Sequence, residues 1–272
     1  MVNYNLSIYN LHFFFVCKGS HYSGKKRYLC TENINIDMKK EYTDLFIDFD
    51  DTLYDTHGNA VIALRELFEE QEFGRWFSDP EVFYTEYWRT NIDLWSRYSK
   101  GEITRDYLIV ERFRKPLSIG MDTAPTEAYC REVGDRFLDF CANKPGLIEG
   151  ARELMDYLRG KGYRIHMCSN GFHEVQYRKL RACGLDKHFT TIILSEDAGA
   201  NKPSAQYFDY AFKVSAAPKE TTLMIGDNFQ TDILGAKQVG LDTAYFNRFP
   251  EYPAPEAVTF EVTALRQLMD IL

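Results

Sequence analysis

The chain has 272 residues and a net charge of −8, and 45% of its residues are hydrophobic and 26% charged. These values are ordinary for a globular protein and argue against intrinsic disorder. The acidic balance without a long basic run argues against nucleic acid as a partner, and no apolar run reaches the ~18 residues that a membrane span needs, so we expect no membrane partner.

Residues 1–41 look compositionally detached, and we predict that they form an extension outside the folded core. The apolar stretch from Leu11 to Cys17 is short and has no basic segment before it, so it does not fit a secretory signal. Met38 looks like a natural start just before the first strand. Two interpretations stay open, a poorly ordered extension and a mis-called start.

A short strand and a long helical segment are expected next. Residues 45–47 are apolar and lead into acidic residues, which is typical of a buried parallel strand. From residue 57 to 143, apolar residues recur at near-helical spacing, so we expect an all-helical insert. Gly101 and Pro116 are expected to break its helices.

After Pro145-Gly146 the pattern changes to alternating strands and helices. We predict strands at 164–168, 190–194, 222–225 and 243–246, and helices at 151–159, 175–183, 204–214, 233–239 and 262–272. This alternation predicts an α/β fold, a Rossmann-like doubly wound parallel sheet with helices on both faces. The core domain would comprise residues 42–56 and 144–272, and the helical insert, 57–143, would be a separate domain.

Polar residues follow the predicted strands, at the edge where an open parallel sheet binds its ligands. They are Asp48, Asp50, Asp51 and Thr52 after the first strand, Ser169 and Asn170 after the second, Lys202 after the third, and Asp227 and Asp232 after the fourth.

At least three carboxylates would share this volume with one lysine. Like charges so close cannot all stay ionised without a compensating cation, so a divalent metal is implied. Oxygen ligands without histidine or cysteine favour Mg²⁺ over zinc. A metal, a lysine, a hydroxyl and backbone N–H groups together suit a phosphate group and phosphoryl transfer.

The six cysteines form no CxxC pair and no cluster with histidine, which argues against a zinc site. We interpret them as reduced thiols of a cytoplasmic protein.

The run Asp48-Phe49-Asp50-Asp51-Thr52 resembles the first motif, DxDx[TV], of the haloacid dehalogenase superfamily. Ser169-Asn170-Gly171 resembles its second motif, Lys202 its third, and Gly226-Asp227 with Asp232 its fourth. DxDxT alone is weak evidence, whereas four motifs in order, each at a predicted strand end, are specific. The resemblance covers residue 42 to the C-terminus.

The resemblance implies a phosphatase in which Asp48 attacks phosphorus and forms an aspartyl-phosphate. Asp50 would protonate the leaving oxygen and then activate water. Superfamily dehalogenases lack an acid at that position, because a halide leaves without a proton.

Ligand roles follow from the same resemblance. Mg²⁺ would be held by a side-chain oxygen of Asp48, the backbone carbonyl of Asp50 and the carboxylate of Asp227, with Asp232 orienting a metal-bound water or Lys202. The phosphate-binding residues would be Thr52, Ser169, Asn170 and Lys202. The side chain of Thr52 is equally explained as a partner of backbone groups.

The helical insert lies where the superfamily carries its C1 cap, which selects the leaving group. Residues 91–104 and 111–113 resemble the cap of pyrimidine 5′-nucleotidases, which would make a nucleoside monophosphate the small phosphorylated substrate. Asn91, Trp95 and Arg112 are then candidates to contact a base or sugar. An equal alternative is that they hold the cap helices together.

Rival functions remain open: a phosphosugar phosphatase, a phosphomutase of the same superfamily, and a non-catalytic protein that binds a phosphometabolite. We expect a monomer or a homodimer.

Overall fold

The computed structural model describes residues 40–272, so the prediction of a detached N-terminal extension lies almost entirely outside the described residues. Residues 41–272 form one compact unit. No helix among residues 40–272 is long and apolar enough to cross a lipid bilayer. The division of this unit into a core domain and a cap domain stays a prediction.

A parallel sheet of six strands, in the order β3-β2-β1-β4-β5-β6, forms the centre of the core. The strands are β1 (Asp44–Asp48), β2 (Arg164–Ser169), β3 (Thr191–Leu194), β4 (Thr222–Gly226), β5 (Asp242–Phe246) and β6 (Phe260–Val262). Each neighbouring pair is parallel. Because the strand order reverses at β1, a crevice at its carboxyl end is where a ligand is expected.

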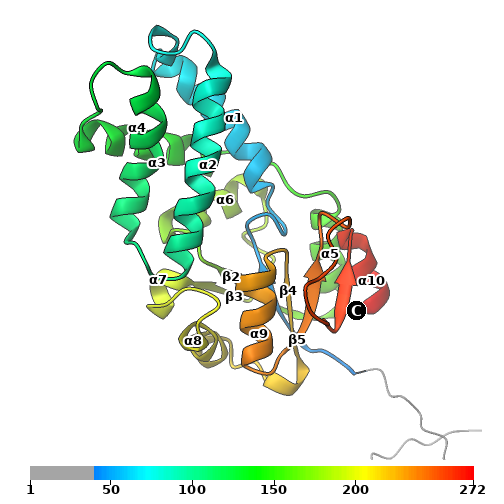
Figure 1. Cartoon of the computed structure of the whole chain (residues 1–272). Coiled ribbons are helices and arrows are strands. Elements are labelled where there is room, and N and C mark those ends of the chain that lie inside the picture. Colours follow the sequence, from blue (N-terminus) through cyan, green and yellow to red (C-terminus); the bar gives the residue numbers. More distant parts are fainter. Residues whose placement is uncertain (1–39) are drawn as a thin grey trace, which may run out of the picture. The chain divides into compact units, whose positions relative to one another are not determined.

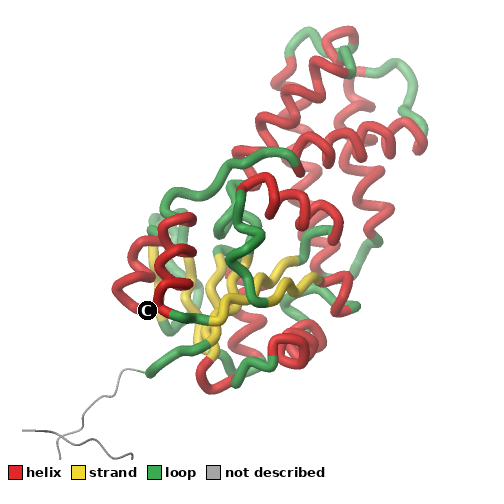
Figure 2. The backbone as a smooth tube through the Cα atoms, turned by 180° about the vertical axis from the view of Figure 1, so that it is seen from behind, coloured by secondary structure: helices red, strands yellow, loops and turns green. Residues whose placement is uncertain are grey.

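Alternate residues of the strands pack against helices on the two faces of the sheet. From β1, Leu45 and Ile47 join one apolar cluster with helices α5 (Ala151–Lys161), α6 (His173–Cys183) and α10 (Leu268–Ile271). Phe46 joins the cluster on the other face with α8 (Ala205–Ser215) and α9 (Gly235–Gln238). The yellow strands in Figure 2 therefore lie between red helices, and the predicted α/β fold is confirmed.

The insert between β1 and α5 is helical, as predicted. It contains α1 (Thr56–Glu70), a 3₁₀ turn η1 (Phe73–Arg75), α2 (Pro80–Ser99), α3 (Arg105–Gly120) and α4 (Glu127–Ala142), and Figure 1 labels the four long helices. Each long helix begins with a side chain that accepts a backbone N–H, from Asp55, Asp79, Thr104 and Thr126. The helices bury a shared aromatic cluster that includes Phe68, Phe83 and Phe113.

The expectation that Pro116 breaks a helix is wrong. Proline has no amide hydrogen and loses one helical hydrogen bond, so it normally ends or kinks a helix. In α3 the chain remains helical for four residues beyond Pro116, because Pro116 and Leu117 are buried against the other helices. Tertiary packing offsets the lost hydrogen bond.

The predicted helix at 262–272 is also wrong in its first part. Val262 ends β6, which pairs with β5, and only a 3₁₀ turn η4 (Leu265–Gln267) and the short α10 follow. Val262, Leu265 and Leu268 are buried three residues apart, and this spacing imitates one face of a helix. A strand of three residues is too short to show its own period.

Besides β6, three short elements of the core were not predicted. They are α7 (Ser195–Ala198), a 3₁₀ turn η2 (Lys219–Thr221) and a π-helical turn η3 (Phe229–Leu234), which runs into α9. The last of them forms part of the site described next.

Candidate active site

Lys202 is buried at the carboxyl edge of the sheet, and only 2% of it is exposed. Its Nζ donates to Asp48 Oδ1, to Asp232 Oδ1 and to the backbone carbonyl of Cys168, each at 2.7 Å. An ammonium group has three N–H donors, and all three are used. Burial acts to lower the pKa of Lys202, but the Asp232 and Asp48 carboxylates outweigh it and raise that pKa. Lys202 is therefore a fixed positive charge.

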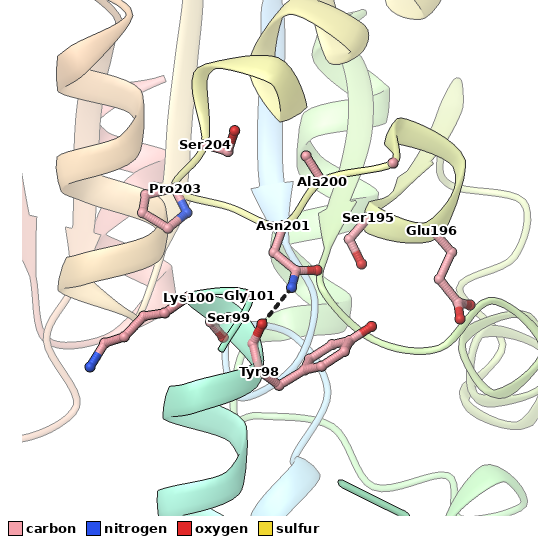
Figure 3. Close-up of a pocket in the computed structure, with 11 residues that line it drawn as sticks. Tyr98, Ser99, Lys100, Gly101, Ser195, Glu196, Ala200, Asn201, Pro203 and Ser204 are labelled. Atoms are coloured by element: carbon pink, nitrogen blue, oxygen red, sulfur yellow. Dashed lines mark hydrogen bonds between the residues drawn. The ribbon is translucent and has the colours of Figure 1, made fainter. Parts of the chain in front are cut away.

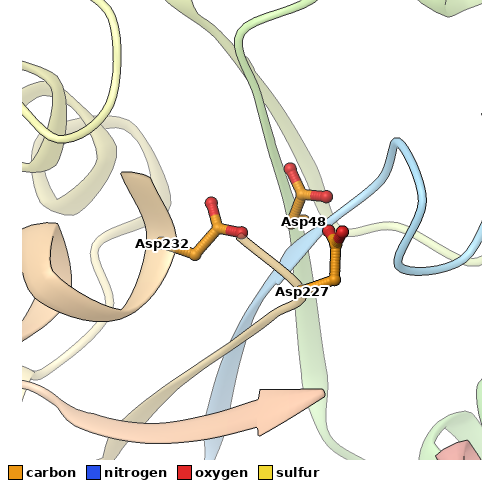
Figure 4. A group of neighbouring side chains, drawn as sticks. All are labelled: Asp48, Asp227 and Asp232. Carbon is orange, nitrogen blue, oxygen red and sulfur yellow. The ribbon is translucent and has the colours of Figure 1, made fainter. Parts of the chain in front are cut away.

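Three carboxylates face this single lysine. Oxygens of Asp48, Asp227 and Asp232 all lie within 4.8 Å of one another, from the ends of β1 and β4 and from η3 (Figure 4). Burial raises the pKa of Asp48 to about 7, with Lys202 opposing and Asp232 adding to the rise. Burial and the Asp48 charge also raise the pKa of Asp227 well above its usual range.

This donor set fits a divalent cation. Three close carboxylates exceed the charge of one lysine, and their mutual repulsion adds to the rise that burial causes in the pKa of Asp48 and of Asp227. The available ligands are carboxylate oxygens, which suit Mg²⁺. Both oxygens of Asp232 already accept protein hydrogen bonds, from Lys202 and from the Asn228 backbone N–H. Thr52 has a single hydrogen to share between Asp48 Oδ2 and Asp227 Oδ1, so these two acids between them keep at least one oxygen for a ligand, and the supporting role of Asp232 stays a prediction.

The Thr52 hydroxyl lies between two of these acids, Asp48 and Asp227. Its Oγ1 lies 3.0 Å from Asp48 Oδ2 and 3.0 Å from Asp227 Oδ1, and it accepts the Asp227 backbone N–H at 3.1 Å. The side chain is completely buried. In this structure the hydroxyl of Thr52 is therefore occupied by Asp48 and Asp227, and its predicted contact with phosphate stays a prediction.

The position before Asp227 requires glycine for a steric reason. A Cβ on Gly226 would lie 2.3 Å from Asp232 Oδ2. Because real Cβ atoms do not come so close, only glycine lets η3 bring Asp232 back over the end of β4. The spacing of this motif is thus set by a close approach of backbone and side chain.

The last side chain of β2 and the one after it hold the site loops together. Asn170 Nδ2 donates to the Lys202 carbonyl at 3.0 Å, and Asn170 Oδ1 accepts the Lys202 backbone N–H at 2.8 Å. Ser169 Oγ accepts the Gly171 N–H at 3.0 Å and lies 3.3 Å from Asp50 Oδ2. Asn170 thus fixes the loop that carries Lys202, a role that sequence reasoning did not assign. Phosphate binding by Ser169 and Asn170 stays a prediction.

Asp50 is surrounded by four side-chain donors, and three of them, Thr56, Gln176 and Lys179, were not predicted. Thr56 Oγ1 donates to its Oδ1 at 2.7 Å, and Ser169 and Gln176 donate to its Oδ2. Lys179 Nζ forms an ion pair with Oδ1 at 2.5 Å. Burial acts to raise the pKa of Asp50, but Lys179 and the other donors lower it overall.

Gln176 and Lys179 lie on α6, directly after the second motif. A signal for Lys179 existed in the sequence, because it lies four residues after the apolar Val175 and therefore on the same helical face. A lysine on the buried face of an amphipathic helix needs an anionic partner. The sequence does not show which carboxylate that partner would be.

A cavity of about 820 Å³ opens beside these carboxylates and extends between the core and the helical insert. Its lining includes Asp48, Asp50 and Lys202 from the core, and Asn91, Trp95 and Arg112 from the insert. Sequence-predicted residues of both parts therefore share one cavity. That volume is large enough for a nucleotide-sized ligand.

The three insert residues differ in their contacts. The Trp95 ring packs on Phe172 at 5.4 Å between centroids, which is a structural contact. Arg112 is 3% exposed and its guanidinium lies 5.5 Å from the centre of the Phe137 ring, yet its Nε and Nη2 have no hydrogen-bond partner and it forms no ion pair within residues 40–272. Asn91 Oδ1 is likewise buried without a partner. Unpartnered buried polar atoms that line a cavity are suited to ligand contacts.

A second hollow of about 660 Å³ lies between the end of α2 and the segment from α7 to α8 (Figure 3). Asn201 Nδ2 donates to the Tyr98 carbonyl across it at 2.8 Å. Glu196, one of its charged residues, is already paired with Arg105 and with the His173 N–H. The polar residues around this hollow thus connect the helical insert to the core. None of the motif carboxylates lines it.

Comparisons with known proteins agree with this geometry. A family model described as haloacid dehalogenase-like hydrolase matches residues 45–240. The HAD-hydrolase YfnB of Bacillus subtilis is 34% identical over 235 residues, which is 86% of this chain and 96% of that protein. Its magnesium-bound crystal structure superposes with a TM-score of 0.76, at 32% identity, over 85% of this chain and 99% of that one.

Two other relatives differ in their described substrates. The pyrimidine 5′-nucleotidase YjjG of Escherichia coli is 29% identical over 84% of this chain and 96% of its own. The glyceraldehyde 3-phosphate phosphatase of Pyrococcus abyssi is 28% identical over 74% of this chain and 80% of its own.

Proposed function

The chain belongs to the haloacid dehalogenase-like hydrolase family, and we propose that it is a magnesium-dependent phosphomonoester hydrolase with Asp48 as its nucleophile. The observation that carries this proposal is the convergence of Asp48, Asp227 and Lys202 at the carboxyl end of the sheet. Phosphoryl transfer needs a nucleophile and positive charge around the phosphate oxygens. This site offers both.

In the first step, an Asp48 carboxylate oxygen forms a bond to phosphorus, and the bond from phosphorus to the ester oxygen breaks. Lys202, which contacts Asp48 Oδ1, favours the ionised nucleophile. Asp50, after taking up a proton from solvent, gives that proton to the leaving alkoxide. In the second step, Asp50 takes a proton from water, which attacks the aspartyl-phosphate and releases phosphate.

The residues that would hold Mg²⁺ are Asp48 and Asp227 through side-chain oxygens and Asp50 through its backbone carbonyl. When bound, the ion supplies the positive charge that offsets the carboxylates and the phosphate oxygens.

The acid at position 50 also favours a phosphatase over a dehalogenase. Asp50 lines the cavity next to Asp48 and is held by side chains from three segments. An alcohol leaving group requires a proton donor there, whereas a halide does not.

For the substrate, we propose a pyrimidine nucleoside 5′-monophosphate. The cavity has aromatic residues, including Trp88 and Trp95, along the insert side, and the unpartnered donors of Arg112 lie among them. A flat heterocycle with carbonyl oxygens matches those features, and the likeness to YjjG supports it. A phosphosugar phosphatase is the second candidate, supported by the likeness to the Pyrococcus enzyme.

The mechanism is tested with Asp48→Asn, which keeps the shape of the side chain and removes its nucleophilic charge. We expect Mg²⁺-dependent phosphate release to fall by at least about a thousandfold, because nucleophile loss typically costs that much or more. Circular dichroism should show an unchanged fold. Turnover close to that of the wild type in this variant would remove the mechanism.

The substrate is tested with Arg112→Met on dUMP, dTMP, sugar phosphates and p-nitrophenyl phosphate. Losing a charged hydrogen bond to the base should lower kcat/KM for the nucleotides by about 10- to 100-fold. The small aryl ester should change less than about threefold, since it does not reach Arg112. Arg89→Met, whose side chain is 77% exposed, is the matched control.

Two results would redirect the substrate proposal. If sugar phosphates exceed nucleotides by an order of magnitude in the wild type, the nucleotidase proposal is wrong. A single-turnover reaction in ¹⁸O-labelled water distinguishes a hydrolase from a phosphomutase, because only hydrolysis puts solvent oxygen into the phosphate.

A further inference from the structure

We propose that Lys179 is a positioning residue for Asp50, and that together with Gln176 it orients this carboxyl toward the ester oxygen of the substrate. This inference rests on the proposed phosphatase activity. It concerns two side chains of α6 that belong to none of the four motifs.

The first observation is the way Asp50 is held. Its Oδ1 contacts Lys179 at 2.5 Å and Thr56 at 2.7 Å, and its Oδ2 contacts Gln176 and Ser169. A carboxylate offers about four acceptor positions, so these contacts fix its rotation as well as its place. Asp50 nevertheless keeps 26% of its side chain exposed, so a group bound in the cavity can reach it.

The second observation is that Lys179 is committed to this one partner. Its side chain is 9% exposed, and within residues 40–272 Asp50 is the carboxylate with which it forms an ion pair. A buried ammonium without another anion nearby stays with the partner it has. The ammonium also lies 4.9 Å from the centre of the Tyr54 ring, which limits its movement on a further side.

The third observation ties this arrangement to the insert. The Tyr54 hydroxyl donates to the carbonyls of Cys141 and Lys144, both at 2.9 Å, where α4 ends and the chain returns to the core. Next to Lys179, Arg178 pairs with Asp139 of α4 at 2.6 Å. The position of α6, and so of Lys179, is therefore fixed against the helix that closes the cavity.

Without Lys179, Oδ1 of Asp50 would retain only Thr56 among its side-chain donors. The carboxyl could then turn about its χ angles, and its time-averaged distance from the ester oxygen would grow. Proton transfer is sensitive to such misplacement, since a positioned acid contributes about 10²- to 10⁴-fold in rate. The loss should therefore depend on how much the leaving group needs a proton.

The test is Lys179→Met, which keeps the length of the side chain, assayed on dUMP and on p-nitrophenyl phosphate. Because nitrophenolate leaves without a proton, kcat/KM for the aryl ester should change less than about threefold. For dUMP, whose alkoxide needs the proton, kcat/KM should fall by about 10- to 100-fold. Lys179→Arg should restore part of the loss, and Gln176→Met should give a smaller loss with the same preference.

Lys187→Met, the same change at an exposed position just beyond α6, is the matched control and should behave as the wild type. An equal fall on both esters in Lys179→Met would overturn the inference, since it would mean a general structural defect or a phosphate contact. No change on either ester, or a faster reaction of dUMP, would overturn it as well. If Lys179→Met does not fold, Gln176→Met decides by the same comparison.

Failure of the proposed function would look different. In that case the wild type would hydrolyse neither ester, or Asp48→Asn would hydrolyse both at the wild-type rate. An active wild type with an inactive Asp48→Asn and no leaving-group preference in Lys179→Met would remove the positioning role alone.

Discussion

At the scale of single residues, the site is a balance of one buried cation against several buried anions. Lys202 contacts Asp48 and Asp232 and is itself almost fully buried. Removing one partner of such a network leaves charges in a medium that solvates them poorly, which costs more than the pair itself contributes. Lys202, which is proposed to bind phosphate, is therefore also needed for the stability of the fold.

We expect Lys202→Met to lower the free energy of unfolding by about 3–5 kcal/mol, because Asp48 and Asp232 lose their buried counter-ion. Urea denaturation at pH 7 measures this change. The exposed Lys187→Met, measured alongside, should differ from the wild type by less than about 0.5 kcal/mol. A loss of under about 1 kcal/mol in Lys202→Met would contradict the view that this network stabilises the core.

The residue scale also shows where sequence reasoning succeeded and where it stopped. Asp48, Lys202, Asp227 and Asp232 were predicted to meet, and the structure brings them together. That these four residues meet follows from the order of the motifs and from their location after predicted strands of one parallel sheet. Lys179 was not predicted, because its importance depends on which carboxylate α6 faces, and this is a matter of helix rotation and packing.

At the scale of elements, β1 determines the site because it is the strand at which the order of the sheet reverses. Its carboxyl end carries Asp48, and its amino end carries Asp44. Asp44 is fully buried and contacts His166 of β2 at 2.9 Å and Arg164 at 2.8 Å. The two ends of one strand thus hold a candidate catalytic acid and a structural acid.

His166 makes the stability of β1 and β2 dependent on pH. Burial lowers the pKa of His166 below its usual 6.5, although Asp44 opposes this, and its Nδ1 is buried without a partner. As the pH falls below 6.5, the unfolded chain takes up a proton that the folded chain resists. Stability is therefore present above pH 6.5 and is lost progressively as the pH approaches the lower folded pKa.

We expect the free energy of unfolding of the wild type to fall more steeply between pH 7 and pH 5 than that of His166→Gln. Glutamine keeps an N–H donor for Asp44 and does not titrate. The difference in slope is at most about 1.4 kcal/mol per pH unit, the value for one proton. Urea denaturation at several pH values measures it, and parallel curves for the two proteins would contradict the role of His166.

Element boundaries were the least predictable part of the fold. The core strands and helices were found within a few residues, because their apolar patterns are long enough to show a period. The strand β6 and the continuation of α3 through Pro116 were missed. Both are stabilised by neighbours that are distant in sequence, β5 in one case and the buried aromatic cluster in the other.

At the scale of the whole molecule, the proposed metal should couple the site to global stability. Asp227 directly follows β4, and Asp48 is the last residue of β1, so an ion bound by both would join the ends of two adjacent strands. Any ligand that binds only the folded state stabilises it by an amount that grows with its concentration. The metal is thus expected to affect unfolding as well as catalysis.

We expect Mg²⁺ at about a hundred times its dissociation constant to add about 2.7 kcal/mol of stability. For a chain of this size that corresponds to a rise in Tm of roughly 5–10 °C, reversed by EDTA. Asp227→Asn should show little of this rise, and without metal it should be at least as stable as the wild type, because a repelling charge is gone. An equal rise in both proteins would contradict a metal site at Asp227.

The sequence by itself determined the class of fold, the family resemblance and the identity of the acids and lysine that meet at the sheet edge. These features depend on local pattern: apolar runs that form strands, and polar residues that directly follow them. The tertiary structure alone decided that Asn170 fixes the Lys202 loop, that Lys179 and Gln176 hold Asp50, and that Nε and Nη2 of Arg112 are buried without a hydrogen-bond partner. Each of these contacts joins residues from segments far apart in the chain, or leaves a buried group unsatisfied, and only the packing of whole elements determines such outcomes.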